Sequence, residues 1–300
     1  MAQFAYSPDY YCDVGSHVFK MEKYRLLHDR LVDQELVSPD EFLTPQPADR
    51  EALELVHTDD YLNDLRGGRH THRTVTSEMP ISRGIVDAYV LHTGGTILAC
   101  RTALQQHTMS MNMAGGWHHA FADHAEGFCY INDVAVGMKK MLQAGLIKRG
   151  IVVDCDLHQG NGTARIFRDE PAVFTFSIHQ EALYPIKQKS DRDVGLRNHC
   201  GGEEYLEALE NNLLPALDEH EPEFAIFVAG ADPYEKDQLG SLDLTIEHLR
   251  RRDDLVIGQC QQREIPVTAL LAGGYAPDVN DTVRIHLGTA RSLIEHPLGN

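Results

Sequence analysis

Amphipathic helical segments alternate with short apolar runs along this chain of 300 residues. Between Ile131 and Leu142 the apolar residues recur at helical spacing, and the same pattern returns between Val283 and Ile294. Five further segments have helical character, and Gly94-Gly95 and Pro215 are expected to kink or split two of them. These segments are 17–33, 48–56, 83–105, 203–217 and 245–263.

Apolar runs of strand length separate the helices, at 109–114, 151–154, 173–178, 224–228 and 267–271. They lack the in-and-out alternation of a half-exposed strand, and such continuous runs between amphipathic helices are typical of a parallel sheet covered on both faces. The chain contains no long Pro/Gly/Ser linker, low-complexity tract or internal repeat. The pattern therefore predicts an α/β fold with one domain over residues 1–300.

Charge and composition restrict the partners. The 45 acidic and 27 basic residues give a net charge of −18, and the densest basic run, Arg250-Arg251-Arg252, is followed directly by Asp253-Asp254. This balance argues against binding of nucleic acid. No membrane span or signal peptide is recognisable, and six scattered cysteines without a C-x-x-C pair indicate reduced thiols, so we expect a cytoplasmic chain without membrane contact.

Ionisable side chains collect just after four of the apolar runs. Because ligands of an open parallel sheet bind at the carboxyl ends of its strands, these segments are the candidate site. The segments are Gly115-Gly116-Trp117-His118-His119, Asp154-Cys155-Asp156-Leu157-His158, Ala229-Gly230-Ala231-Asp232 and Ala272-Gly273-Gly274-Tyr275.

The alternation in Asp154-x-Asp156-x-His158 projects two carboxylates and an imidazole to the same side. With Asp232 from another strand end, this donor set suits zinc or iron and leaves a position open for water. A lone D-x-D-x-H is more often a turn of solvated acids, and a lone aspartate such as Asp232 more often caps a helix. Agreement among the four strand ends weakens these alternatives.

Two other strand ends could supply the groups that move protons and bind an oxyanion. His118 and His119 could act as general base and general acid beside a metal-bound water, although each alone is more often a surface histidine or one that supports a ligand. Tyr275 could direct its phenol at a developing oxyanion, although a single loop tyrosine usually serves in packing.

These residues and their neighbours resemble the successive motifs of the zinc-dependent histone deacetylase family, in the family's order. The resemblance extends from Val56 to Tyr275, and the H-Q-G-N-G run with the compact length is most similar to the class IV branch and its bacterial relatives. The motifs are His118-His119-Ala120, Gly127-Phe128-Cys129-Tyr130-Ile131-Asn132-Asp133, Asp154-Cys155-Asp156-Leu157-His158-Gln159-Gly160-Asn161-Gly162, Ser177-Ile178-His179, Gly230-Ala231-Asp232-Pro233 and Gly273-Gly274-Tyr275.

The resemblance implies the arginase/deacetylase fold, with a central eight-stranded parallel sheet flanked by helices on both faces. It also implies hydrolysis of N-acyl-lysine amides with one Zn²⁺ per chain, bound by Asp156, His158 and Asp232. The implied catalytic residues are His118, His119, Tyr275, Asp154, which orients His118, and Asn161. The implied structural K⁺ site comprises Asp154, Asp156, His158, Ser177 and Ile178, and the implied substrate tunnel comprises Gly127, Phe128, Leu183, Tyr184 and Gly273.

Asn161 is a departure, because many members carry at this position the aspartate that pairs with the second histidine. The sequence leaves open an amidohydrolase acting on acetylpolyamines or other small amines, and an acyl-lysine reader without activity. The expected partner is an acyl-lysine peptide or protein, or an acylated small amine. The acyl chain length, the native metal and the oligomeric state stay open.

Overall fold

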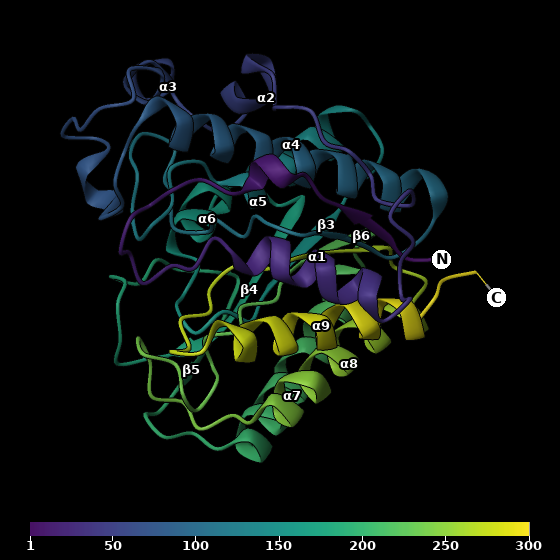
Figure 1. Ribbon diagram of the computed structural model, residues 1–300. Coiled ribbons are helices and arrows are strands. Elements are labelled where there is room, and N and C mark those ends of the chain that lie inside the picture. The colour runs from purple at the N-terminus through teal and green to yellow at the C-terminus, as the bar shows by residue number, and fades with distance from the viewer. Residues whose placement is uncertain (300) are drawn as a thin grey trace.

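One parallel sheet of seven strands lies at the centre of the computed structural model, which describes residues 1–299 (Figure 1). The strand order is β1-β2-β7-β6-β3-β4-β5, and every neighbouring pair is parallel. The strands are β1 (Gln3–Ala5), β2 (Ser110–Asn112), β3 (Gly150–Asp154), β4 (Val173–Gln180), β5 (Arg192–Leu196), β6 (Phe224–Val228) and β7 (Val267–Leu270).

The five predicted strands are confirmed as β2, β3, β4, β6 and β7. The expected eighth strand does not occur among residues 1–299. Outside β1 the ladder continues only as an isolated parallel bridge between Ala5 and Leu43, which is too short to count as a strand. The sheet is otherwise of the expected parallel, helix-covered kind.

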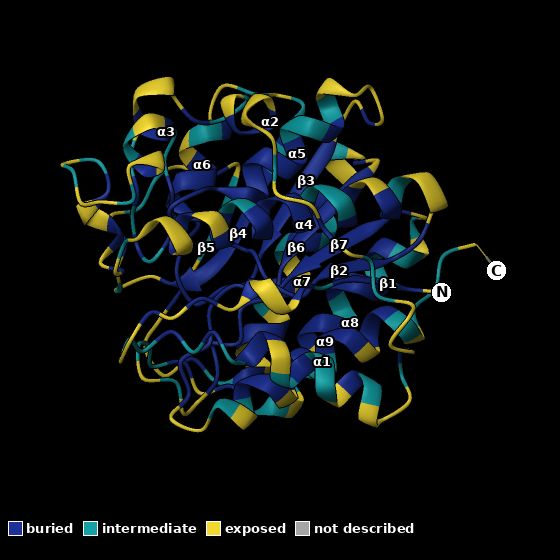
Figure 2. Cartoon of the chain, turned by 45° about the horizontal axis from the view of Figure 1, so that its top comes forward, coloured by how far each residue is buried: buried dark blue, intermediate teal, exposed yellow. Residues whose placement is uncertain are grey.

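Helices cover both faces of the sheet and give three layers (Figure 2). On one face α4 and α5 pack together, with α2, α3 and α6 near them, and on the other α1, α7, α8 and α9 form a connected layer. The bounds are α1 (Lys23–Asp33), α2 (Arg50–Glu54), α3 (Asp59–Arg66), α4 (Arg83–Gln106), α5 (Asp133–Gln143), α6 (Asn161–Phe167), α7 (Gly202–His220), α8 (Ile246–Gln262) and α9 (Val279–Glu295), with short 3-10 turns at Pro8–Tyr10 and Val75–Ser77.

The expected interruption of α4 at Gly94-Gly95 is wrong, because the helix runs unbroken from Arg83 to Gln106. A Cβ at Gly94 would collide with the backbone of Gln46, and a Cβ at Gly95 would collide with the Tyr10 hydroxyl. The two glycines therefore permit close packing of the N-terminal segment on α4. Pro215 likewise lies inside α7 without splitting it.

The central strands are buried along their whole length, since every residue of β2, β3, β6 and β7 is shielded from solvent. This burial explains why the apolar runs do not alternate. All six cysteines are buried free thiols. Among the helices of residues 1–299, none is both long and apolar enough to span a membrane.

Candidate active site

The four strands followed by ionisable segments are neighbours in the sheet, in the order β2-β7-β6-β3. Because all of them are parallel, their carboxyl ends open on the same edge, which is where open parallel sheets bind ligands. The predicted site residues are thereby brought together from positions more than 150 residues apart in the sequence.

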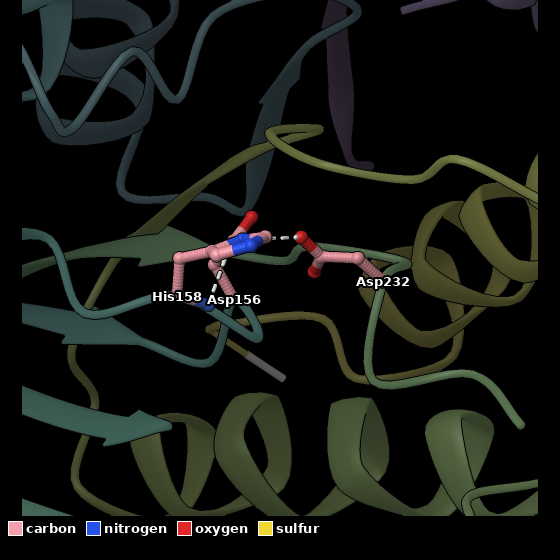
Figure 3. Close-up of side chains that lie close together, drawn as sticks. All are labelled: Asp156, His158 and Asp232. Carbon is pink, nitrogen blue, oxygen red and sulfur yellow. Dashed lines mark hydrogen bonds and ion pairs between the residues drawn. The ribbon is translucent and has the colours of Figure 1, made fainter. Parts of the chain in front are cut away.

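Asp156, His158 and Asp232 form a buried cluster whose candidate ligand atoms all lie within 4.8 Å of one another. His158 Nδ1 lies 3.2 Å from Asp156 Oδ1 and 3.2 Å from Asp232 Oδ2. In Figure 3, Asp232 approaches from a loop facing the segment that carries Asp156 and His158, so the three side chains converge on one point. This set of one nitrogen and two carboxylate donors is able to hold a divalent metal.

Backbone amides fix the two carboxylates of this cluster. Leu157 N–H donates to Asp232 Oδ1 at 2.9 Å, and Gly273 N–H donates to Asp156 Oδ2 at 2.9 Å. Burial and the neighbouring Asp156 carboxylate raise the pKa of Asp232 to about 6. A cation at this point would relieve the repulsion between the two carboxylates.

The two adjacent histidines lie beside this cluster and have different partners. His118 Nδ1 is 2.7 Å from Asp154 Oδ2, whereas His119 Nδ1 is 2.8 Å from Asn161 Oδ1, and the two Nε2 atoms are 3.1 Å apart. Burial lowers the pKa of His118, but the Asp154 and Asp156 carboxylates outweigh it and raise this pKa to about 9. Burial, His118 and His158 hold the pKa of His119 well below its ordinary value.

The loop that presents the histidines depends on a buried carboxylate at the start of α5. Asp133 accepts hydrogen bonds from Gly116 N–H at 3.2 Å, from Trp117 N–H at 2.8 Å and from the Thr96 hydroxyl at 2.5 Å. Gly116 has φ +82°, and a Cβ there would collide with Ala272 after β7. The turn before His118 therefore requires glycine as well as the Asp133 cap.

A cavity of about 200 Å³ opens onto the site. Tyr275, His119 and His158 line it together with four of the five predicted tunnel residues, and these four are Gly127, Phe128, Leu183 and Tyr184. Tyr275 is buried to 6% exposure, with its ring 5.8 Å from that of Phe128 and 6.4 Å from that of His158. The predicted tyrosine and the predicted metal-binding histidine thus share one cavity.

The fifth predicted tunnel residue and the predicted K⁺-site residues lie at or next to the candidate metal-binding cluster. Gly273, the fifth expected tunnel residue, packs against the Asp156 and Asp232 carboxylates, with which a Cβ would collide. Ser177 is the β4 neighbour of Asp154 in the β3–β4 register, and Ile178 follows it on the same strand. The residues of the predicted K⁺ site are therefore adjacent in the fold.

A lysine in the first turn of an amphipathic helix is expected to face solvent, but Lys23 at the start of α1 is buried. Its side chain is 1% exposed, and Nζ donates to the Ala272 carbonyl at 2.6 Å. Burial lowers the pKa of Lys23 to about 8 against the pull of Asp232, Asp156 and Asp237.

Three further polar residues near the site were not assigned a part in it from the sequence. In the sequence, Asp133 ends the G-F-C-Y-I-N-D motif, Arg252 belongs to a basic run and Glu126 belongs to no motif, so none of them carries a signal for the site. Arg252 is fully buried, and its Nη1 donates to the carbonyls of Gly230 at 2.5 Å and Cys155 at 3.3 Å. The unusual sequence signal was an arginine in the apolar phase of a helix.

The chain matches the family model described as the histone deacetylase domain over residues 17–289. An uncharacterized protein of Picosynechococcus is 40% identical over 284 residues, which cover 94% of each chain. Histone deacetylase 2 of Arabidopsis thaliana is 28% identical over 86% of this chain and 70% of its own, and human histone deacetylase 1 is 27% identical over 89% of this chain and 59% of its own.

A solved structure described as the HDA15 HD domain superposes with a TM-score of 0.83 at 22% identity, over 98% of this chain and 89% of that one. This likeness establishes the shared fold, and the extent of the domain match, together with the four strand ends that meet at one cavity, settles the family. The chain belongs to the histone deacetylase family of hydrolases.

Proposed function

We propose that this protein is a zinc-dependent deacylase that hydrolyses N-acyl-lysine amides and is most like the class IV branch of its family. The observation that carries the proposal is the convergence of three kinds of group on one cavity. These groups are the Asp156–His158–Asp232 cluster, the His118–His119 pair and Tyr275.

The buried cluster fits zinc. It offers one imidazole nitrogen and two carboxylates from different loops, and zinc held by these three side chains would keep its fourth position for water or substrate. When bound, zinc supplies Lewis-acid polarisation of the amide carbonyl and activation of water near neutral pH.

The remaining steps fall to side chains of this chain. His118 and His119, adjacent through their Nε2 atoms, take a proton from the attacking water and deliver one to the leaving amine. Asp154 keeps His118 oriented through the Nδ1 contact of 2.7 Å. The Tyr275 hydroxyl donates to the oxyanion that develops on the amide oxygen.

The cavity supports a linear acyl-lysine as substrate. Its volume of about 200 Å³ suits one extended chain better than a folded ligand, and Phe128 and Tyr184 provide aromatic walls for a methylene stem. Asp154, Ser177 and Ile178, adjacent at the β3–β4 pair, are proposed to contribute to a structural K⁺ site with Asp156 and His158.

The test is metal analysis combined with turnover of an acyl-lysine panel that runs from acetyl to long fatty acyl, with acetylated polyamines added. We expect one zinc per chain and hydrolysis of at least one acyl-lysine. Asp232→Asn is the control, because it removes a carboxylate donor, and it should lose both metal and turnover. Stoichiometric zinc without hydrolysis of any amide would overturn the proposal, and turnover of polyamines alone would replace the substrate class.

A further inference from the structure

Glu126 is a half-buried carboxylate beside the active site that the proposed chemistry leaves unused. Its Oε1 accepts a hydrogen bond from Asn161 Nδ2 at 2.8 Å and another from the Tyr184 hydroxyl at 3.2 Å. The other end of the same amide, Asn161 Oδ1, faces His119 Nδ1 at 2.8 Å. The three side chains form a chain of hydrogen bonds from the rim of the cavity to the second histidine.

The direction of this chain follows from donor and acceptor chemistry. An ionised carboxylate only accepts hydrogen bonds, so Glu126 requires the NH₂ end of Asn161. The oxygen of Asn161 must then point at His119, and an oxygen can only accept. His119 therefore carries its proton on Nδ1, which leaves the Nε2 lone pair facing His118 and the cavity.

An unassisted amide would not fix that tautomer. A rotated Asn161 would turn its NH₂ group toward His119 Nδ1, and the imidazole would then carry its proton on Nε2, where it could not accept one. Rotation of an amide costs little unless a neighbour distinguishes its two ends. Glu126 is the neighbour that does so on the side away from His119.

We infer that Glu126 is a positioning residue for His119 and acts through the orientation of the Asn161 amide. The inference rests on the proposed function in treating His119 as a proton-transfer group. In relatives with aspartate at the position of Asn161, a carboxylate pairs directly with the second histidine. In this chain the carboxylate is Glu126, and it contacts His119 only through Asn161.

This arrangement makes the residues at 126 and 161 interdependent. With aspartate at 161, both ends of that side chain accept, so no orienting partner is needed. Its oxygen would also lie about as close to Glu126 as Nδ2 does now, at 2.8 Å, and two carboxylates at that distance repel. Glu126 should therefore help catalysis beside Asn161 and harm it beside an aspartate.

A purely structural part for Glu126 is the competing explanation. Its Oε2 lies 3.7 Å from His124 Nε2, and its backbone bridges to Cys129. The titratable groups that face its side chain are thus His124 and Tyr184. If Glu126 only anchored its loop, its loss would reduce activity whatever residue stands at 161. If it orients the Asn161 amide, the effect of its loss depends on the residue at 161.

The kinetic experiment compares Glu126→Ala and Glu126→Gln in the native chain and in an Asn161→Asp background, with metal content and unfolding temperature measured for each. In the native chain we expect Glu126→Ala to lower kcat by about 10-fold, the scale of a lost supporting contact, with little change in KM. Glu126→Gln offers both an acceptor oxygen and a donor NH₂, so it distinguishes the two ends of the Asn161 amide less well than the carboxylate, and its loss of turnover should be smaller than that of Glu126→Ala but measurable. In the Asn161→Asp background, Glu126→Ala should raise kcat.

His124→Gln is the matched control, because it removes the ionic partner of Glu126 and leaves its contacts with Asn161 and Tyr184 in place, so kcat should change by less than about twofold. An equal loss for Glu126→Ala in both backgrounds would overturn the inference, as would no loss in the native chain. If the native, zinc-loaded protein hydrolyses nothing on the panel, the proposed function fails, and the inference is decided by spectroscopy instead.

That second measurement is the tautomer of His119, read from nitrogen-15 NMR of histidine-labelled protein and assigned by comparison with His119→Gln. We expect the Nδ1–H form in the native chain and a mixture of tautomers in Glu126→Ala. An Nε2–H form in the native protein, or an unchanged tautomer in Glu126→Ala, would overturn the inference with or without turnover.

Discussion

Arg252 is expected to be a major contributor to stability, although its neighbour in the basic run, Arg251, is not. Both lie on α8, but Arg252 is fully buried while the side chain of Arg251 is 44% exposed. Arg252 Nε donates to Asp253 Oδ1 at 2.9 Å, and Nη1 reaches the carbonyls of Cys155 and Gly230. It thus connects the loop between Asp154 and Asp156 to the loop that leads to Asp232.

Arg252→Met keeps much of the side-chain volume and removes the charge. Asp253 would retain its hydrogen bond from the Thr289 hydroxyl, at 2.6 Å, but would lose its buried cation. Removing one partner of a buried ion pair costs about 3–5 kcal/mol. Because domains unfold with about 5–15 kcal/mol, this is a large share of the total, and at about 2–4 °C per kcal/mol it lowers Tm by about 6–20 °C.

The assay is urea and thermal unfolding of the zinc-loaded protein, with Arg251→Met as the matched control. Arg251 pairs at the surface with Glu203, so its substitution should leave Tm within about 2 °C. The double variant Arg252→Met with Asp253→Asn should recover part of the loss, since the uncompensated charge is gone. A loss below about 1 kcal/mol for Arg252→Met would refute the reasoning.

Four further outcomes are expected. Tyr275→Phe should lower kcat by about 100-fold or more with KM nearly unchanged, and near-normal turnover of a zinc-loaded sample would contradict the oxyanion assignment. Asn161→Asp places a carboxylate on His119 and should move the pH–rate profile to higher pH, which steady-state rates across pH 5–9 would test. Removal of metal by a chelator should lower Tm, by the equivalent of about 3 kcal/mol when the metal had stood at 100 times its Kd, and zinc should restore it. Finally, burial lowers the pKa of His92 to about 4, so between pH 6.5 and 4 this side chain binds more protons in the unfolded chain than in the folded one. Its contribution to stability should fall by roughly 1.5 kcal/mol from pH 6.5 to 5, and urea unfolding of His92→Phe should show the pH dependence reduced by that amount.

Elements of the fold that depend on local pattern were predictable from the sequence. Apolar composition predicts the buried strands β3, β6 and β7, and helical spacing of apolar residues predicts α5 and α9. In contrast, β5 reads Arg-Asp-Val-Gly-Leu, and only its pairing with the end of β4 makes it a strand. Gly94-Gly95 suggested a break because helix propensity is local, whereas the contact with Tyr10 and Gln46 that favours glycine is not.

In the site too, residues with a local sequence signal could be predicted, and residues that depend on distant contacts could not. Asp156, His158 and Asp232 could be proposed because their spacing and place after apolar runs carry a chemical meaning by themselves. Glu126 and Lys23 act through partners 35 and 249 residues away in the sequence, namely Asn161 and Ala272. No spacing rule links such pairs, so the support of the site became visible only when the chain was folded.

The buried carboxylates at this edge of the sheet would favour a bound cation. Asp154, Asp156 and Asp232 are each at most 2% exposed and lie on adjoining loops. The buried Lys23 donates its hydrogen bond to a carbonyl and not to a carboxylate. Arg252 pairs with the Asp253 carboxylate and donates to two backbone carbonyls. Neither cation therefore forms an ion pair with the cluster. His118 offsets one carboxylate through its contact with Asp154. The remaining negative charge lies between Asp156 and Asp232, where burial makes it costly. A divalent metal held by these two carboxylates and His158 would remove that cost, and under the proposed function it would do so where the substrate amide is polarised.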